Sequence, residues 1–258
     1  MVVHHGPLRA IIWDFDGTLV DTREKNMNVN RQIVRVITDQ PWERFPVLES
    51  VAAYDEAQRR FTNWREFYHR GIGLSEDEID RAGAMWTGLQ LTDTTPAPLF
   101  DGITAALGRL RGAAVQGIVS QNSRQNIEEM LEGVGLLHHF EHIVGYEEVG
   151  TQRQKPAPDG LLMCIERLTN SAAGTVLYVG DHETDVRCAR NADRALTEQR
   201  IPLHVVTVGA FFDSPGSDGS WSVRPDYRAS SPEDVVSIVE ELRENRKFHS
   251  DASIDSRG

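Results

Sequence analysis

Four polar clusters in this sequence follow apolar segments, at the places where buried strands would end. The first contains Asp14 and Asp16, directly after the apolar run 8–13. The others, in chain order, are Ser120-Gln121-Asn122, then Lys155, and then Asp181 with Asp185. In an open α/β sheet, ligands bind beyond the carboxyl ends of the strands, so the four clusters could meet at one edge.

These residue types suit the transfer of a phosphoryl group. Asp14, Asp16 and Asp181 would supply the hard oxygen ligands that Mg²⁺ prefers, and the metal would offset their mutual repulsion. Lys155 and the Ser120 hydroxyl could hold the remaining phosphate oxygens. One carboxylate could then attack phosphorus while its neighbour two residues on handles the proton.

The elements that must position these clusters alternate as strand and helix. We expect strands at 8–13, 113–119, 142–145, 175–179 and 203–208. We expect helices after Asp101, after Ser123, at 156–168, at 183–196 and from Ser231 onward. Alternation of this kind buries a parallel sheet between helices, so the sequence predicts an α/β fold. Segment 209–225 is predicted to be a long loop with hydrophobic anchors.

A long insertion with helical periods separates the first strand from a Pro-containing linker at 94–98. One predicted helical face carries Val29, Ile33, Val36 and Ile37, and a second carries Tyr54, Ala57, Phe61, Trp64 and Tyr68. Ser75 and Glu78 have the spacing of a capping box. The predicted organisation is an α/β core at 1–20 and 95–243, a helical cap at 21–94 and a flexible tail at 244–258.

Composition narrows the class of protein. The 258 residues include 39 acidic and 27 basic side chains, and the net charge of −12 repels nucleic acid and acidic lipid surfaces. Cys164 and Cys188 cannot build a disulfide framework, and the N-terminus lacks a signal-peptide pattern. We therefore expect a cytoplasmic protein, with its oligomeric state open. A small anionic substrate stays possible if a metal ion or a local Lys/Arg cluster overcomes the repulsion.

Four motifs carry a resemblance to a known family. They are Asp14-Phe15-Asp16-Gly17-Thr18-Leu19, Ser120, Lys155-Pro156-Ala157-Pro158-Asp159 and Gly180-Asp181-His182-Glu183-Thr184-Asp185. In order and separation they resemble the motifs of the haloacid dehalogenase superfamily, in its phosphatase branch, over roughly 8–242. The insertion resembles the C1-type cap of the phosphoglycolate phosphatase and β-phosphoglucomutase relatives. This resemblance implies a Rossmann-like parallel-sheet core with an inserted all-helical cap.

The resemblance also implies roles for individual residues. Asp14 would be the nucleophile that forms an aspartyl-phosphate, and Asp16 the general acid and then base. Mg²⁺ would be held by Asp14, Asp16 and Asp181, with Asp185 in support. The predicted phosphate-binding residues are Gly17, Thr18, Ser120, Gln121 and Lys155.

Substrate contacts are less well specified by the sequence. Arg23 and Lys25 follow the first motif and could contact substrate. Asn122 and His182 stand where relatives often have other residues, and either could contact substrate. For His182 the favoured interpretation is a solvent-facing or helix-capping role.

The resemblance implies a Mg²⁺-dependent phosphomonoesterase that acts on a small phosphorylated metabolite and is similar to the phosphoglycolate phosphatases. Three alternatives to this interpretation remain open. A sugar-phosphate mutase relative usually has a His early in the cap, and none occurs at 21–28. A phosphonate hydrolase would need a cap lysine as Schiff base, for which Lys25 is the candidate. A receiver-like, phospho-accepting binding module could carry similar acids and a lysine, but such modules lack a long helical insertion.

Overall fold

The chain divides into an α/β unit, Met1–Leu19 with Leu99–Gly258, and a helical unit, Val20–Pro98. The computed structural model describes residues 6–61, 63–213 and 221–251. Among the helices described there, none combines the length and apolar composition that crossing a membrane requires.

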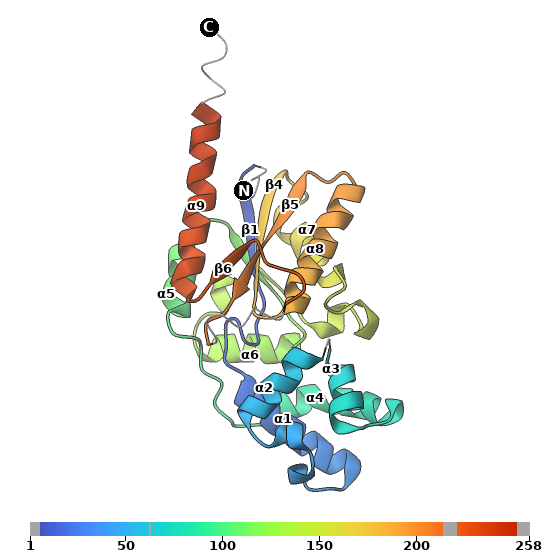
Figure 1. Cartoon of the computed structure of the whole chain (residues 1–258). Coiled ribbons are helices and arrows are strands. Elements are labelled where there is room, and N and C mark those ends of the chain that lie inside the picture. The colour runs from blue at the N-terminus through green and yellow to red at the C-terminus, as the bar shows by residue number, and fades with distance from the viewer. Residues whose placement is uncertain (1–5, 62, 214–220, 252–258) are drawn as a thin grey trace. The chain divides into compact units, whose positions relative to one another are not determined.

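A six-stranded sheet in the order β3-β2-β1-β4-β5-β6 forms the centre of the α/β unit (Figure 1). Its strands are β1 (Leu8–Trp13), β2 (Val115–Val119), β3 (His142–Val144), β4 (Gly174–Gly180), β5 (Leu203–Ala210) and β6 (Tyr227–Ala229). Every neighbouring pair is parallel, so all carboxyl ends lie at one edge. The predicted α/β fold with a parallel sheet and a helical insertion is confirmed.

Helices cover both faces of this sheet. Helices α7 (Asp159–Thr169) and α8 (Glu183–Glu198) share one buried cluster with alternate residues of β1 and β4, including Ala10, Ile12, Val176 and Tyr178. In Figure 1, α5 (Ile103–Leu110) and α9 (Pro232–Asp251) lie on the opposite side of the sheet and pack together. Helix α6 (Arg124–Gly133) follows β2. Burial on both faces explains why the central strands are continuous apolar runs.

The two cysteines belong to this packing. Cys164 and Cys188 are buried in the cluster beneath α7 and α8, and burial raises the pKa of both thiols. A thiol with a raised pKa is a poor nucleophile. Both cysteines therefore act as small packing residues in the core.

Strand β6 was missed by the sequence analysis, which expected a loop at 209–225 followed directly by the last helix. This strand has three residues and pairs only with β5, so it has little periodicity to detect. Asp226 joins it to the sheet, since its carboxylate accepts hydrogen bonds from the Thr207 backbone N–H (2.9 Å) and hydroxyl (2.8 Å). Of the predicted anchors, Phe211 packs against Trp221, while residues 214–220 lie outside the described part of the chain.

Helix α9 extends past Glu244, where the predicted tail begins, to Asp251. The flexibility of the segment 244–258 stays a prediction. Charged residues such as Glu, Arg and Lys have high helix propensity, so polarity alone did not mark the end of the helix. Residues 252–258 lie outside the described residues.

The helical unit has its own core. Its main helices are α1 (Arg23–Thr38), α2 (Val51–Arg60), the single turn α3 (Trp64–Glu66) and α4 (Glu76–Thr92). The apolar face of α1 packs through Val29, Ile33 and Ile37, together with Val34, whereas the predicted face residue Val36 is 60% exposed. The capping box is present, because the Ser75 backbone N–H donates to Glu78 at 2.8 Å.

The second predicted helical face, which carries Tyr54, Phe61, Trp64 and Tyr68, is divided between several elements and does not lie on one helix. Helix α2 ends at Arg60, and Asn63 starts α3 by accepting a hydrogen bond from the Glu66 N–H at 2.9 Å. A π-helical turn, Phe67–Ile72, follows. Tyr54, Phe61 and Tyr68 are nonetheless buried in the core of this unit.

Candidate active site

The predicted chemical residues stand at the carboxyl ends of neighbouring strands of the α/β unit. Asp14 follows β1, and its backbone N–H continues the sheet by donating to Val179 at 2.8 Å. Asp181 follows β4, and Ser120 follows β2. Because β2, β1 and β4 are adjacent and parallel, their terminal loops meet. The structure therefore brings these separated motifs together.

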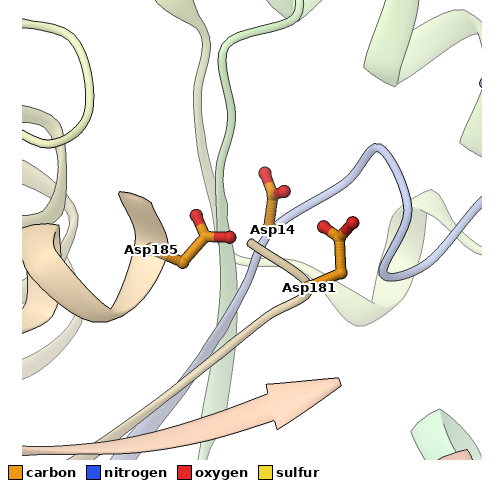
Figure 2. A group of neighbouring side chains, drawn as sticks. All are labelled: Asp14, Asp181 and Asp185. Atoms are coloured by element: carbon orange, nitrogen blue, oxygen red, sulfur yellow. The ribbon is translucent and has the colours of Figure 1, made fainter. Parts of the chain in front are cut away.

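Three carboxylates form a compact acidic group (Figure 2). One oxygen each from Asp14, Asp181 and Asp185 lies within 4.8 Å of the other two. Asp14 follows β1, whereas Asp181 and Asp185 belong to the stretch that runs from β4 into α8. Asp185 belongs to the first turn of α8, where the His182 backbone N–H donates to it at 3.0 Å. Hard carboxylate oxygens at this spacing fit a divalent cation such as Mg²⁺. Asp16, also predicted as a ligand, is outside this triad, and its metal role stays a prediction.

Lys155 holds two of these acids together. Its Nζ lies 2.7 Å from Asp14 Oδ1 and 2.7 Å from Asp185 Oδ1. All three side chains are buried. Removal from water penalises each charge, and this arrangement offsets the penalty with charge-assisted hydrogen bonds.

Burial dominates the electrostatics of the site. It raises the pKa of Asp14 to about 7, with Lys155 acting in the opposite direction. Burial, followed by the charges of Asp14 and Asp185, raises the pKa of Asp181 well above its usual value. Burial alone would lower the pKa of Lys155, but the two neighbouring carboxylates outweigh it and the net shift is upward. Without a bound cation, Asp14 and Asp181 therefore keep their protons to higher pH than ordinary carboxyl groups, and a bound cation would stabilise their ionised forms.

Tyr178 is a site residue that the sequence analysis missed. Its hydroxyl on β4 lies 3.3 Å from Asp185 Oδ1, and Lys155 Nζ is 5.4 Å from the centre of its ring. Tyr178 therefore packs beneath the ion pair. The available signal was a phenol within an otherwise apolar buried strand, where a hydroxyl needs a partner.

Asp16 contacts a different set of groups. The Asn122 side-chain amide donates to Asp16 Oδ1 at 3.2 Å and to Oδ2 at 3.1 Å. The Ser120 hydroxyl lies 3.5 Å from Asp16 Oδ2. A small cavity is bordered by Ser120, Gln121 and Lys155, which were predicted to bind phosphate. Asp16 therefore contacts Asn122 and Ser120, whereas Asp14 bonds to Lys155.

Gly17 and Thr18 pack closely against Asp181. Gly17 has φ +75°, and a β-carbon there would lie closer than 3.0 Å to the Asp181 carboxylate. The Thr18 hydroxyl donates to Asp181 Oδ1 at 3.3 Å. Glycine is therefore needed both for its backbone conformation and for space.

We expect Gly17→Ala to lower kcat/KM by about 10²-fold or more, because the added methyl displaces Asp181 and misplaces the reacting groups. Steady-state kinetics over a Mg²⁺ titration would measure this, with a raised Mg²⁺ requirement as the accompanying sign. Gly88→Ala is the matched control, since a β-carbon there meets nothing within 4 Å. Wild-type kinetics in Gly17→Ala would contradict the assignment.

His182 acts as a helix cap in the structure. Its Nδ1 accepts a hydrogen bond from the Thr184 backbone N–H at 3.2 Å at the start of α8. This agrees with the favoured interpretation of His182. A contact with substrate stays a prediction.

Arg23 and Lys25 belong to the helical unit and bind within it. Arg23 pairs with Asp21 at 2.6 Å. Lys25 is buried, and its Nζ donates to the Asp93 carbonyl at 2.6 Å. This contact gives Lys25 a structural role and weakens the phosphonate-hydrolase alternative, which needs a free amine. Contacts of either residue with substrate stay predictions.

Several known proteins are similar to this chain over about nine-tenths of its length. The phosphoglycolate phosphatase of Synechococcus elongatus is 30% identical over 237 residues, which cover 91% of this chain and 99% of that relative. The pyrophosphatase PpaX of Listeria monocytogenes is 23% identical, over 91% of this chain and 97% of that relative. A solved haloacid dehalogenase-like hydrolase from Streptococcus pneumoniae has the same fold, with a TM-score of 0.65 at 19% identity, covering 90% of this chain and 98% of that chain.

A family model provides the assignment. The model described as haloacid dehalogenase-like hydrolase matches residues 11–197, a span that runs from β1 through the helical unit into α8. That span includes the insertion that a receiver-like module lacks, so the resemblance drawn from the four motifs is confirmed. The chain belongs to the haloacid dehalogenase-like hydrolase family.

Proposed function

We propose that this chain is a Mg²⁺-dependent phosphomonoesterase that acts on a small phosphorylated metabolite, with phosphoglycolate as the specific substrate. The observation that carries the proposal is the pair Asp14 and Asp16. Asp14 lies 2.7 Å from the Lys155 ammonium, while Asp16 is held separately by Asn122. Two carboxylates in different environments can perform different tasks, one as nucleophile and one as acid and base.

In the proposed reaction, a carboxylate oxygen of Asp14 attacks phosphorus and displaces the substrate's alcohol, which receives a proton from Asp16. Water then attacks the phosphorus of the aspartyl-phosphate and gives its proton to Asp16, so that phosphate is released and Asp14 is regenerated. Lys155 and the Ser120 hydroxyl bind phosphate oxygens and orient them. A cation held by Asp14, Asp181 and Asp185 would neutralise charge on the phosphoryl group.

The names of two relatives support two candidate substrate classes. The 30% identical relative is named phosphoglycolate phosphatase, and this supports a phosphomonoester as substrate. The relative named pyrophosphatase PpaX favours a second candidate, inorganic pyrophosphate. In both substrates the bond that breaks joins phosphorus to oxygen, so the same core residues would serve either reaction.

A substrate comparison tests the proposal. Phosphate release from 2-phosphoglycolate, inorganic pyrophosphate and a hexose 1-phosphate would be measured with Mg²⁺, and Asp14→Asn would serve as the blank. We expect the highest kcat/KM with 2-phosphoglycolate and one phosphate released for each substrate consumed. Preference for pyrophosphate would replace the monoester by the second candidate. Conversion of hexose 1-phosphate to its 6-phosphate with little phosphate released would establish the mutase alternative.

Removal of metal is expected to stop turnover, because Lys155 is the sole cation bonded to the triad among the described residues. Activity should disappear in a chelator and return with Mg²⁺. Ca²⁺ should restore little of it, since its larger and looser coordination shell would misplace Asp14 relative to phosphate. Undiminished activity in excess chelator would contradict the metal requirement.

A further inference from the structure

The side chain of Asn122 is directed at Asp16 rather than at open space. It is only 2% exposed, and its Nδ2 lies 3.1–3.2 Å from both Asp16 oxygens. The two residues are 106 positions apart, so this contact is made by the fold. A buried amide that is fully engaged in this way is poorly placed to contact substrate, the role in which the sequence analysis had considered it.

The orientation of the Asn122 amide is fixed by its other end. Its Oδ1 accepts hydrogen bonds from the Ser123 backbone N–H at 2.8 Å and from Asn126 Nδ2 at 3.2 Å. A backbone N–H can only donate, so the oxygen of the amide must face Ser123. The NH₂ group must then face Asp16, so the Asp16 carboxylate accepts hydrogen bonds from Asn122.

The first turn of α6 supplies this arrangement. Ser123 caps the helix by accepting from the Asn126 backbone N–H at 3.2 Å. Asn126, itself buried, lies one helical turn after Asn122. Hydrogen bonds therefore link the start of α6, its Ser123 cap and the pair Asn122–Asn126, and this arrangement lies against Asp16.

We infer that Asn122 is the positioning residue for Asp16 in catalysis, and that Asn126 in turn orients Asn122. This inference rests on the proposed reaction, in which Asp16 protonates the leaving alcohol and later deprotonates water. Asn122 acts through Asp16, so its loss should damage those steps that need a proton and spare those that do not.

The leaving group of the substrate separates these steps. Phenyl phosphate has a poor leaving group and needs protonation by Asp16, whereas 2,4-dinitrophenolate leaves without it. For Asn122→Ala we expect kcat/KM with phenyl phosphate to fall by about 10²-fold, the low end of general acid catalysis. With 2,4-dinitrophenyl phosphate, kcat/KM should change less than about threefold, because the transfer of phosphate to Asp14 needs no proton. The later hydrolysis of the aspartyl-phosphate is slowed, so kcat and KM should fall together.

Further variants keep the test decisive. Asn122→Asp keeps the shape but replaces the donor by an acceptor, so it should give the same pattern even if the alanine variant folds poorly. Asn126→Ala should give a weaker form of it, because the Ser123 N–H still holds Oδ1. Gln125→Ala is the matched control on the same helix, and it should behave as wild type. Gln125 is exposed, and its side-chain amide donates to Glu129 at 2.9 Å, away from Asp16.

The outcomes distinguish the inference from the proposed function. Equal losses of kcat/KM on both substrates, or no loss on phenyl phosphate, would overturn the positioning role of Asn122 while leaving the phosphatase intact. A wild-type chain that releases phosphate from neither 2-phosphoglycolate nor any aryl phosphate would overturn the proposed function, and the role of Asn122 with it. Crystal structures of wild type and Asn122→Ala would add an independent readout, because we expect the Asp16 carboxylate to leave its observed position in the variant.

Discussion

Asp14→Asn is expected to lower kcat by at least about 10³-fold while leaving the chain folded. An amide keeps the shape of the carboxylate but cannot attack phosphorus. Lys155 retains its partner Asp185 at 2.7 Å, so no buried charge is left without a counter-charge. Because burial raises the pKa of Asp14, removal of its charge should leave thermal stability unchanged or increase it.

Kinetics and thermal unfolding of Asp14→Asn should therefore move independently. Turnover would be measured with the best monoester under saturating Mg²⁺, together with the unfolding temperature in the presence of chelator. Asp159→Asn is a suitable control, since its carboxylate makes only a 3.7 Å pair with the exposed Arg153 among the described ion pairs. Residual turnover above about one per cent of wild type, beyond what deamidation could supply, would contradict the nucleophile assignment.

Lys155→Met is expected to damage both activity and stability. Without the ammonium, the buried carboxyl groups of Asp14 and Asp185 lose the cation that they share, and removal of one partner from a buried pair costs about 3–5 kcal/mol. For a chain of this size, that corresponds to a fall of roughly 10 °C in unfolding temperature. Activity should fall by at least about 10³-fold, since phosphate loses its main cationic contact.

Magnesium should restore part of the lost stability but little of the activity. A cation bound to the three acids lowers their repulsion, whereas the contact of Lys155 with phosphate is not replaced. Arg59→Met provides the control, because Arg59 is an exposed partner of Asp55 at 3.9 Å and should change stability by less than about 1 kcal/mol. An unfolding temperature for Lys155→Met equal to that of wild type in chelator would show that the ion pair has no structural role.

Local rules accounted for most of the core. The apolar run 8–13 is strand β1 within its predicted bounds, and Asp14 stands directly after it. The Ser75 capping box and the Ser123 cap are both observed. In each case the signal consists of neighbouring residues whose backbone needs are fixed by local geometry.

Features that depend on distant partners were not predictable. Val36 satisfied the helical period but is exposed, because the neighbouring elements pack against Val34 instead. Strand β6 exists through its pairing with β5 and through Asp226. Propensity within a three-residue segment is too weak to show either contact.

The same division applies to the site. Residue types and strand ends were enough to nominate Asp14, Ser120 and Asp181, because parallel strands deliver their carboxyl ends to one edge. The direction of a side chain was not available, so Asn122 was considered as a possible substrate contact, and its hydrogen bonds to Asp16 were not predicted. From the sequence, Tyr178 is likewise recognised only as a strand residue, and it is the structure that places its hydroxyl beside Asp185.

The most direct test of the central claim is to trap the phosphorylated form of Asp14. In Asp16→Asn, 2,4-dinitrophenyl phosphate can still phosphorylate Asp14, because its leaving group needs no acid, but water cannot be deprotonated promptly. Borohydride reduction of an aspartyl-phosphate gives homoserine, which peptide mass spectrometry can locate. The account predicts a burst of about one equivalent of dinitrophenolate per chain, a stoichiometry that follows from covalent catalysis, with homoserine at position 14. A burst with homoserine at another aspartate, or continued turnover with no covalent phosphate, would contradict it.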